Sequence, residues 1–299
     1  MPELPDVELY VTRLSEQVLS QPIESFNCFN PFVLRTVTPK PSELTGRVVI
    51  NVSRLGKRIV LTTEPEAHIV VHLMIAGRFE WHAQKLAKRP NGKVQIAALD
   101  FPTGTLVLRE IATKKRASIG IYPSEAELRA IDPGGIEPLT AALDTFRKAL
   151  AQQNRTVKRA LTDPKTISGI GNAYSDEILF WARLSPVRQT QKLSDQEWLQ
   201  LFNATQETLT RWRDQLARDI PGFPAPAQIT AFRPDFAVHG RFGQPCPVCG
   251  APVQRIAHED NETNYCAACQ NEGRLLADRS LSRLFKSDWP RTLDELARE

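Results

Sequence analysis

The chain has 299 residues and 41% of them are hydrophobic, so it can bury a substantial core, is not intrinsically disordered and favours two domains over one. Its 38 lysine and arginine residues against 34 aspartate and glutamate residues give a formal net charge of +4, which permits a polyanionic partner but does not require one. Because it has neither an apolar run of about 18 residues nor a signal-peptide pattern, we expect a cytoplasmic protein with no membrane partner.

The first predicted element is a helix from Asp6 to Ser20. Pro5 stands just before this segment, where the start of a helix tolerates proline. The apolar residues recur at the spacing of one helical face, which we expect to be buried: Val7, Val11, Leu14 and Val18.

From about residue 47 to residue 122 the sequence changes to short runs of β-forming residues. Closely spaced strands of this kind favour an antiparallel sandwich. Pro102-Thr103-Gly104 predicts a hairpin turn between the last two runs. The runs are Val48–Val52, Arg58–Thr62, Ile69–Leu73, Val94–Leu99 and Leu106–Leu108. Several prolines and glycines between residues 123 and 145 then indicate a linker.

Helical patterns follow the linker. The predicted helices are Thr145–Thr162, Asn172–Arg183 and Ser194–Leu216, and a short amphipathic helix is predicted within residues 275–296. Residues 217–237 are rich in proline and are predicted to be irregular.

The turn Gly169-Ile170-Gly171-Asn172 is a candidate phosphate site. Two glycines permit close approach of a ligand, and the following helix N-terminus and the Asn172 side chain supply N–H donors. Alone the motif is weak, because most such turns are only turns. The basic residues Arg155 and Lys158 lie upstream and strengthen it, although a solvated basic face is the alternative.

Four of the five cysteines have the spacing C-x2-C-x16-C-x2-C, which is typical of a four-thiolate zinc site: Cys246, Cys249, Cys266 and Cys269. Two disulfides are the alternative, but no secretory signal supports an oxidising compartment. Four thiolates leave no open coordination position, so we expect one structural zinc ion.

Pro2 is a candidate nucleophile. If Met1 is removed, the ring nitrogen of Pro2 becomes a free secondary amine, and an α-amine has a pKa of about 8. Such an amine can form an iminium with a sugar aldehyde, and the neighbouring Glu3 could move protons there. On these residues alone an ordinary N-terminus is the better interpretation.

Taken in order, the motifs resemble those of the formamidopyrimidine-DNA glycosylase / endonuclease VIII family of bifunctional base-excision enzymes. The matching segments run from residue 2 to Gln270, which is almost the whole chain. They are Pro2-Glu3-Leu4-Pro5, Leu55-Gly56-Lys57, His72-Leu73-Met74-Ile75-Ala76-Gly77, the run Val157–Pro186, and Gly240-Arg241 followed by Cys246-Pro247-Val248-Cys249-Gly250.

This resemblance implies an α+β fold in five segments. They are a catalytic β-sandwich domain at 2–125 with flanking helices, a linker at 126–144, a helix-two-turn-helix DNA-binding domain at 145–237, a zinc-finger hairpin at 238–272 and a C-terminal extension at 273–299.

The resemblance also implies roles for single residues in a monomer that acts on damaged DNA. Pro2 would attack C1′ of the damaged nucleotide, Glu3 would move protons, and Lys57 would contact phosphate and serve β-elimination. Ile75 stands where the family has a methionine that fills the space left by the flipped nucleotide. The residues that would contact DNA are Ile75, Arg155, Lys158, Asn172 and Arg241.

One departure concerns the products. The finger of the family carries an arginine that is assigned to a second, δ-elimination, and this chain has Asn261 there between acidic residues. We therefore expect mainly β-product, with Arg274 or Arg279 as the substitute to examine otherwise. Two alternatives remain: a non-catalytic protein that binds DNA lesions or junctions, and a zinc-ribbon regulator that binds protein or RNA.

Overall fold

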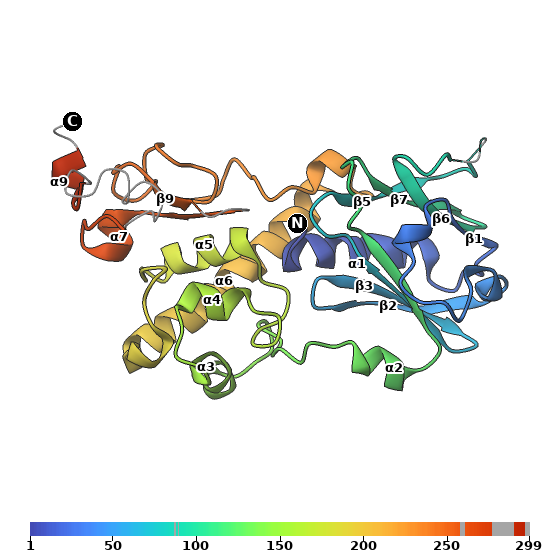
Figure 1. Cartoon of the computed structure of the whole chain (residues 1–299), viewed down its shortest axis with the longest axis horizontal. Coiled ribbons are helices and arrows are strands. Elements are labelled where there is room, and N and C mark those ends of the chain that lie inside the picture. The colour runs from blue at the N-terminus through green and yellow to red at the C-terminus, as the bar shows by residue number, and fades with distance from the viewer. Residues whose placement is uncertain (87, 89, 258–260, 277–289, 297–299) are drawn as a thin grey trace. The chain divides into compact units, whose positions relative to one another are not determined.

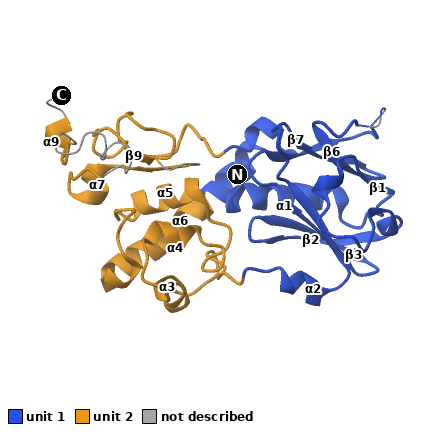
Figure 2. Cartoon of the chain, viewed as in Figure 1, with its two compact units in different colours: residues 1–133, 212–230 blue, residues 134–211, 231–299 orange. Residues whose placement is uncertain are grey.

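A computed structural model of the chain describes residues 1–86, 88, 90–257, 261–276 and 290–296. Its residues divide into two compact units. Figure 1 colours the chain by residue number, and Figure 2 colours it by unit. Unit 1 comprises residues 1–133 and 212–230, and unit 2 comprises residues 134–211 and 231–299. The division into five segments that the sequence suggests stays a prediction.

Unit 1 is the antiparallel β-sandwich that the sequence predicts. Its two four-stranded sheets have the orders β1-β6-β7-β5 and β2-β3-β4-β8, and every pairing within them is antiparallel. The strands are β1 (Ser25–Cys28), β2 (Val48–Leu55), β3 (Arg58–Glu64), β4 (Ala67–His72), β5 (Gly77–His82), β6 (Gln95–Phe101), β7 (Gly104–Glu110) and β8 (Ser118–Tyr122). The predicted turn at residues 102–104 joins β6 to β7, with Phe101 opposite Gly104.

One apolar core in unit 1 joins both sheets to helix α1 (Leu4–Val18) and to residues 212–230. The predicted apolar face of α1 is confirmed at Val7, Leu14 and Val18, which are fully buried, whereas Val11 is only partly buried and packs against the same core. Tyr10 adds to it by packing edge-on against Phe79 of β5 at 5.5 Å between ring centroids. The remaining helical segments of this unit are η1 (Pro31–Val33), η2 (Pro41–Leu44), α2 (Glu125–Ala130) and η4 (Pro226–Gln228).

Helix α1 begins two residues before the predicted start, so Pro5 lies inside its first turn rather than ahead of it. The amides of the first turn have no partner within the helix, so proline loses no hydrogen bond there.

Unit 2 holds the helical region and the zinc hairpin. Its elements are α3 (Leu143–Ala151), α4 (Val157–Thr162), α5 (Asn172–Trp181), η3 (Thr190–Lys192), β9 (Gln254–Ala257), β10 (Glu262–Tyr265), α7 (Ala267–Asn271) and α9 (Leu293–Leu296). Helix α6 (Asp195–Asp219) has residues in both units. Together the sandwich, the helices and the hairpin confirm the predicted α+β class.

The prediction of a single helix from Thr145 to Thr162 is wrong. The helix stops at Ala151 and a second one starts at Val157, because Thr156 is extended and its side chain accepts the N–H of Arg159 as a helix cap. Long-range bonds hold the break open, including the one from the Thr190 N–H to the carbonyl of Arg155, at 2.8 Å.

Most of the predicted tail helix at 275–296 lies outside the described residues. Among the residues that the structure does describe, no helix has the length and hydrophobicity needed to span a bilayer.

Candidate active site and nucleic-acid interface

In unit 1 the start of α1 buries the predicted catalytic residues Pro2 and Glu3. Glu3 is only 3% exposed and its backbone N–H donates to Oδ2 of Asp6 at 2.9 Å. Asp6 is itself buried, and its carboxylate lies in the first turn, where it also faces the positive end of the helix dipole. The N-terminal residues are therefore held against the helix.

Lys57 belongs to the same group of charges. It lies in the tight turn between β2 and β3, where Gly56 has a φ of 63°, a value that favours glycine. Burial lowers the pKa of the Lys57 ammonium, and the nearby Glu3 carboxylate opposes that change. Burial likewise lowers the pKa of the Met1 α-amino group, which also senses the charges of Glu3, Arg78 and Lys57. Unit 1 thus brings the chain N-terminus, Glu3 and Lys57 into electrostatic reach of one another.

Ile75 lies at the exposed tip of the turn between β4 and β5, with 57% of its surface accessible. Met74 has a φ of 54°, which is unusual for a residue other than glycine, and its N–H donates to Nδ1 of His72 at 3.0 Å. Arg78 closes the turn by donating to the carbonyls of Ile75 and Gly77. Two side chains therefore hold Ile75 in an outward position, and sequence reasoning did not identify Arg78.

In unit 2 the predicted phosphate turn leads into α5. Gly169 has a φ of 79°, Gly171 is the extended cap residue, and Asn172 opens the helix. The Nδ2 atom of Asn172 donates to the carbonyl of Glu262 on β10 at 2.8 Å.

The three predicted DNA-binding cations of unit 2 have partners within the unit. Nζ of Lys158 donates to Asp176 at 2.5 Å, to Ser175 and to the carbonyl of Asn172. Arg155 binds the Asp163 carboxylate and the Thr166 hydroxyl, and Arg241 donates to Gln244 and to the carbonyls of Phe236 and Pro245. Their contact with DNA stays a prediction.

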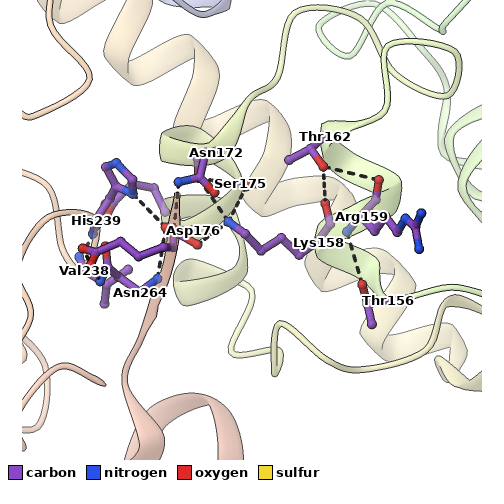
Figure 3. Close-up of polar contacts among 12 residues, drawn as sticks. Thr156, Lys158, Arg159, Thr162, Asn172, Ser175, Asp176, Val238, His239 and Asn264 are labelled. Atoms are coloured by element: carbon purple, nitrogen blue, oxygen red, sulfur yellow. Dashed lines mark hydrogen bonds and ion pairs between the residues drawn. The ribbon is translucent and has the colours of Figure 1, made fainter. Parts of the chain in front are cut away.

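Two buried acids of α5 organise this part of unit 2, and Figure 3 shows the contacts of the first, Asp176. Asp176 pairs with Lys158, accepts from the N–H of Asn264 at 3.2 Å and lies 2.7 Å from Nδ1 of His239. Glu177 accepts the backbone N–H groups of residues 237, 238 and 239 at 2.7 to 2.9 Å. Sequence reasoning missed this pair, although two adjacent acids inside an otherwise apolar helix are a signal of buried polar contacts.

The four predicted zinc ligands come together beside β9 and β10. Their sulfur atoms all lie within 4.8 Å of one another, and two of the pairs, 246–269 and 249–266, are 3.9 Å and 3.4 Å apart. Tetrahedral thiolates with Zn–S bonds of about 2.3 Å are separated by about 3.8 Å, so the set fits one zinc ion. None of the five cysteines forms a disulfide, which removes that alternative.

Asn261, which the resemblance aligns with a finger arginine, is exposed and directly precedes β10. Arg274 is also exposed and lies 3.7 Å from the carboxylate of Glu272, whereas Arg279 lies outside the described residues.

Three sequence models of known domains match the chain in order. They are the formamidopyrimidine-DNA glycosylase N-terminal domain at residues 1–114, the formamidopyrimidine-DNA glycosylase H2TH domain at residues 135–213, and the zinc finger found in FPG and IleRS at residues 243–271. The third match agrees with the sulfur geometry, so the chain carries a site for one structural zinc ion.

Two relatives match over their whole length. The formamidopyrimidine-DNA glycosylase of Thermus thermophilus is 32% identical over 284 residues, which cover 91% of this chain and all of the relative. That of Vibrio vulnificus is 30% identical, with 90% of this chain and all of the relative covered. Among solved structures, the Lactococcus lactis Fpg in complex with DNA containing an abasic site has a TM-score of 0.77 at 23% identity, covering 90% of this chain and 99% of that one.

Proposed function

The chain belongs to the formamidopyrimidine-DNA glycosylase family, and from that premise we propose that it is a base-excision DNA glycosylase with AP lyase activity. The observation that carries the proposal is the buried N-terminus beside Glu3 and Lys57. Burial lowers the pKa of the Met1 α-amino group in this structure. Pro2 is buried at the same chain end, and an α-amine of ordinary pKa about 8 already has an unprotonated, nucleophilic fraction at neutral pH.

The first chemical step is attack of the Pro2 nitrogen on C1′ of the damaged nucleotide, once Met1 is removed. The N–C1′ bond forms, the glycosidic bond breaks, and the base leaves with its bonding electron pair and takes up a proton. Glu3 is a carboxylate beside this centre, and it takes the proton that the Pro2 nitrogen loses and passes it to the sugar ring oxygen, so that the ring opens to an iminium while the departing base takes its proton from solvent.

The second step is β-elimination. The iminium acidifies the C2′ proton, whose removal drives cleavage of the C3′–O bond and expels the 3′ strand as a phosphate. A Lys57 whose pKa is lowered by burial can accept a proton and contact phosphate at this stage. Hydrolysis of the iminium then releases Pro2.

Each unit by itself offers groups that suit DNA. The N–H groups at the start of α5 and the Asn172 amide suit a phosphate, as helix N-termini do. A base can be reached only outside the stack, and exposed apolar side chains such as Ile75 can occupy the space that it leaves. We infer that a monomer carries the complete site, and the mass measured by light scattering tests this.

Borohydride trapping on a duplex with one abasic site tests the function. The iminium is reduced to a stable amine, so the native protein should become covalently attached to DNA. A matched protein with one extra, N-acetylated residue before Pro2 should bind the same duplex but give no adduct, because its Pro2 nitrogen lies in a peptide bond and no other α-amine is free. Equal trapping of both proteins would refute Pro2 as the nucleophile, and binding without any trapping would favour the non-catalytic alternative.

The ratio of β- to β,δ-elimination products tests the effect of having Asn261 at this position. An amide carries no charge to stabilise a second elimination, so the strand should be cut mainly to the β-product. Asn261→Arg should raise the β,δ-fraction, whereas a native protein that already yields mostly β,δ-product would show that another cation acts in its place.

A further inference from the structure

We propose that strand β10 of the zinc hairpin positions Asn172 for phosphate binding and that Asp176 is the positioning residue that couples them. The inference deepens the proposed function and rests on it, because it concerns how the same DNA site is built. The zinc module would then contribute to the site by positioning Asn172, in a chain that has the uncharged Asn261 directly before β10.

The first contact is between Asn172 and the start of β10. The amide nitrogen of Asn172 donates to the Glu262 carbonyl at 2.8 Å, which uses one of its two hydrogens. This bond restricts rotation of the side chain and fixes the plane of the amide. A donor fixed in this way binds phosphate without a further loss of rotamer entropy.

The second contact lies one helical turn further along α5. Asp176 follows Asn172 by four residues and so lies on the same face of the helix, toward β10. Its carboxylate accepts the backbone N–H of Asn264, two residues after Glu262, at 3.2 Å. Asp176 is 1% exposed and is held by Lys158 and His239 from other elements, so it is a rigid anchor for the strand (Figure 3).

Asn264 completes the connection. Its side chain accepts the N–H of Gly240 at 2.8 Å and donates to the carboxylate of Glu262 at 3.1 Å. Asn264 therefore binds the segment that precedes the zinc hairpin and also Glu262, whose carbonyl accepts the Asn172 amide. Cys266, a predicted metal ligand, stands directly after β10. The strand is thus tied to the metal site at one end, to Asp176 in its middle and to Asn172 at its start.

A double-mutant cycle tests this coupling. The affinity for a duplex that carries a tetrahydrofuran abasic analogue would be measured for the native protein, Asn172→Ala, Asp176→Asn and the double variant. Each single change should weaken binding by about 10-fold, the loss expected for one hydrogen bond to a charged group. The double variant should also be only about 10-fold weaker, because both changes remove the same interaction.

Glu177→Gln is the matched control. It removes a neighbouring buried carboxylate that holds residues 237–239 and makes no bond to β10. We expect Glu177→Gln to lower thermal stability. Its effect on the affinity for the duplex should multiply with that of Asn172→Ala, as independent effects do. Zinc content should stay at one ion per chain in every variant. If Asp176→Asn fails to fold, the same cycle is measured with Asn264→Ala in its place, and the same outcomes support or refute the coupling.

Two outcomes would overturn the inference at different levels. Losses that multiply to about 100-fold in the Asn172→Ala, Asp176→Asn double variant would refute the positioning role while leaving the DNA-binding function intact. Failure of the native protein to bind the duplex would refute the proposed function itself.

Discussion

His72 makes the stability of unit 1 depend on pH through the turn that carries Ile75. In its neutral form Nδ1 of His72 accepts the N–H of Met74 at 3.0 Å. Protonation would turn this acceptor into a donor that faces another donor. Burial, and then the charges of Arg58 and Lys57, lower the pKa of His72 from 6.5 to about 4.

The sign and size of the effect follow from this pKa. Between pH 6.5 and about 4 the unfolded chain binds a proton at His72 and the folded chain does not. The contribution of His72 to stability is therefore fully present above pH 6.5 and is lost as the pH falls. The gap between 6.5 and about 4 corresponds to about 3 kcal/mol, of which about 2 kcal/mol should be lost by pH 5.

The assay is urea unfolding of the native protein and of His72→Asn at several values between pH 4 and pH 8. The Asn Oδ1 atom can still accept the N–H of Met74 but cannot be protonated in this range. The free energy of unfolding of the native protein should fall relative to that of the variant as the pH decreases. His82→Asn is the matched control, because it removes an imidazole whose side chain is 39% exposed.

A difference between native protein and His72→Asn that stays constant from pH 8 to pH 4 would refute the reasoning. So would a difference of the expected size in His82→Asn, since it would show that loss of any imidazole has this effect.

Three further changes test other parts of the fold. Removal of zinc with a chelator, or Cys266→Ser, should unfold the zinc finger at residues 243–271, because a structural zinc ion contributes about 10 kcal/mol or more to folding. A circular dichroism spectrum that stays unchanged would contradict this. Gly77→Ala should destabilise by about 1–3 kcal/mol in thermal unfolding, because the added Cβ would lie 2.3 Å from the Leu73 carbonyl, while Gly222→Ala, with open space around it, should be neutral or stabilising. Glu177→Gln should cost about 2–3 kcal/mol in urea unfolding, because it removes a charge that binds three N–H groups, and a cost below about 0.5 kcal/mol would show that these bonds are replaced.

The parts of the fold that the sequence predicts well depend on local signals. The apolar face of α1 follows from helical periodicity, and the β6–β7 hairpin follows from Pro102-Thr103-Gly104. The break between α3 and α4 could not be predicted in this way. It depends on bonds from residues 155–157 to residues 188–190, which lie more than 30 residues along the chain.

The same distinction between local signals and long-range contacts applies to the candidate site. The four cysteines could be identified because two ligands of a metal ion must lie within a short turn, which leaves a spacing in the sequence. The contacts of Asp176 and Glu177 could not, since their backbone partners lie 60 to 88 residues away. Amine and carboxyl chemistry made Pro2 and Glu3 candidates, and the resemblance to a family added Lys57 and favoured Pro2 as the nucleophile; the roles of all three remain predictions.

The discontinuous makeup of unit 1 affects how the protein folds during synthesis. Residues 212–230 complete the sandwich core with Leu216, Ile220 and Ile229, and Arg13 and Arg78 donate to carbonyls in this segment. A ribosome that makes about 5–20 residues per second needs about 5–20 s to extend the chain from residue 133 to residue 230. During that interval all strands of the sandwich have been synthesised but the segment that covers part of their apolar surface has not, so we expect this surface to be exposed, and open to chaperone binding, until residue 230 emerges.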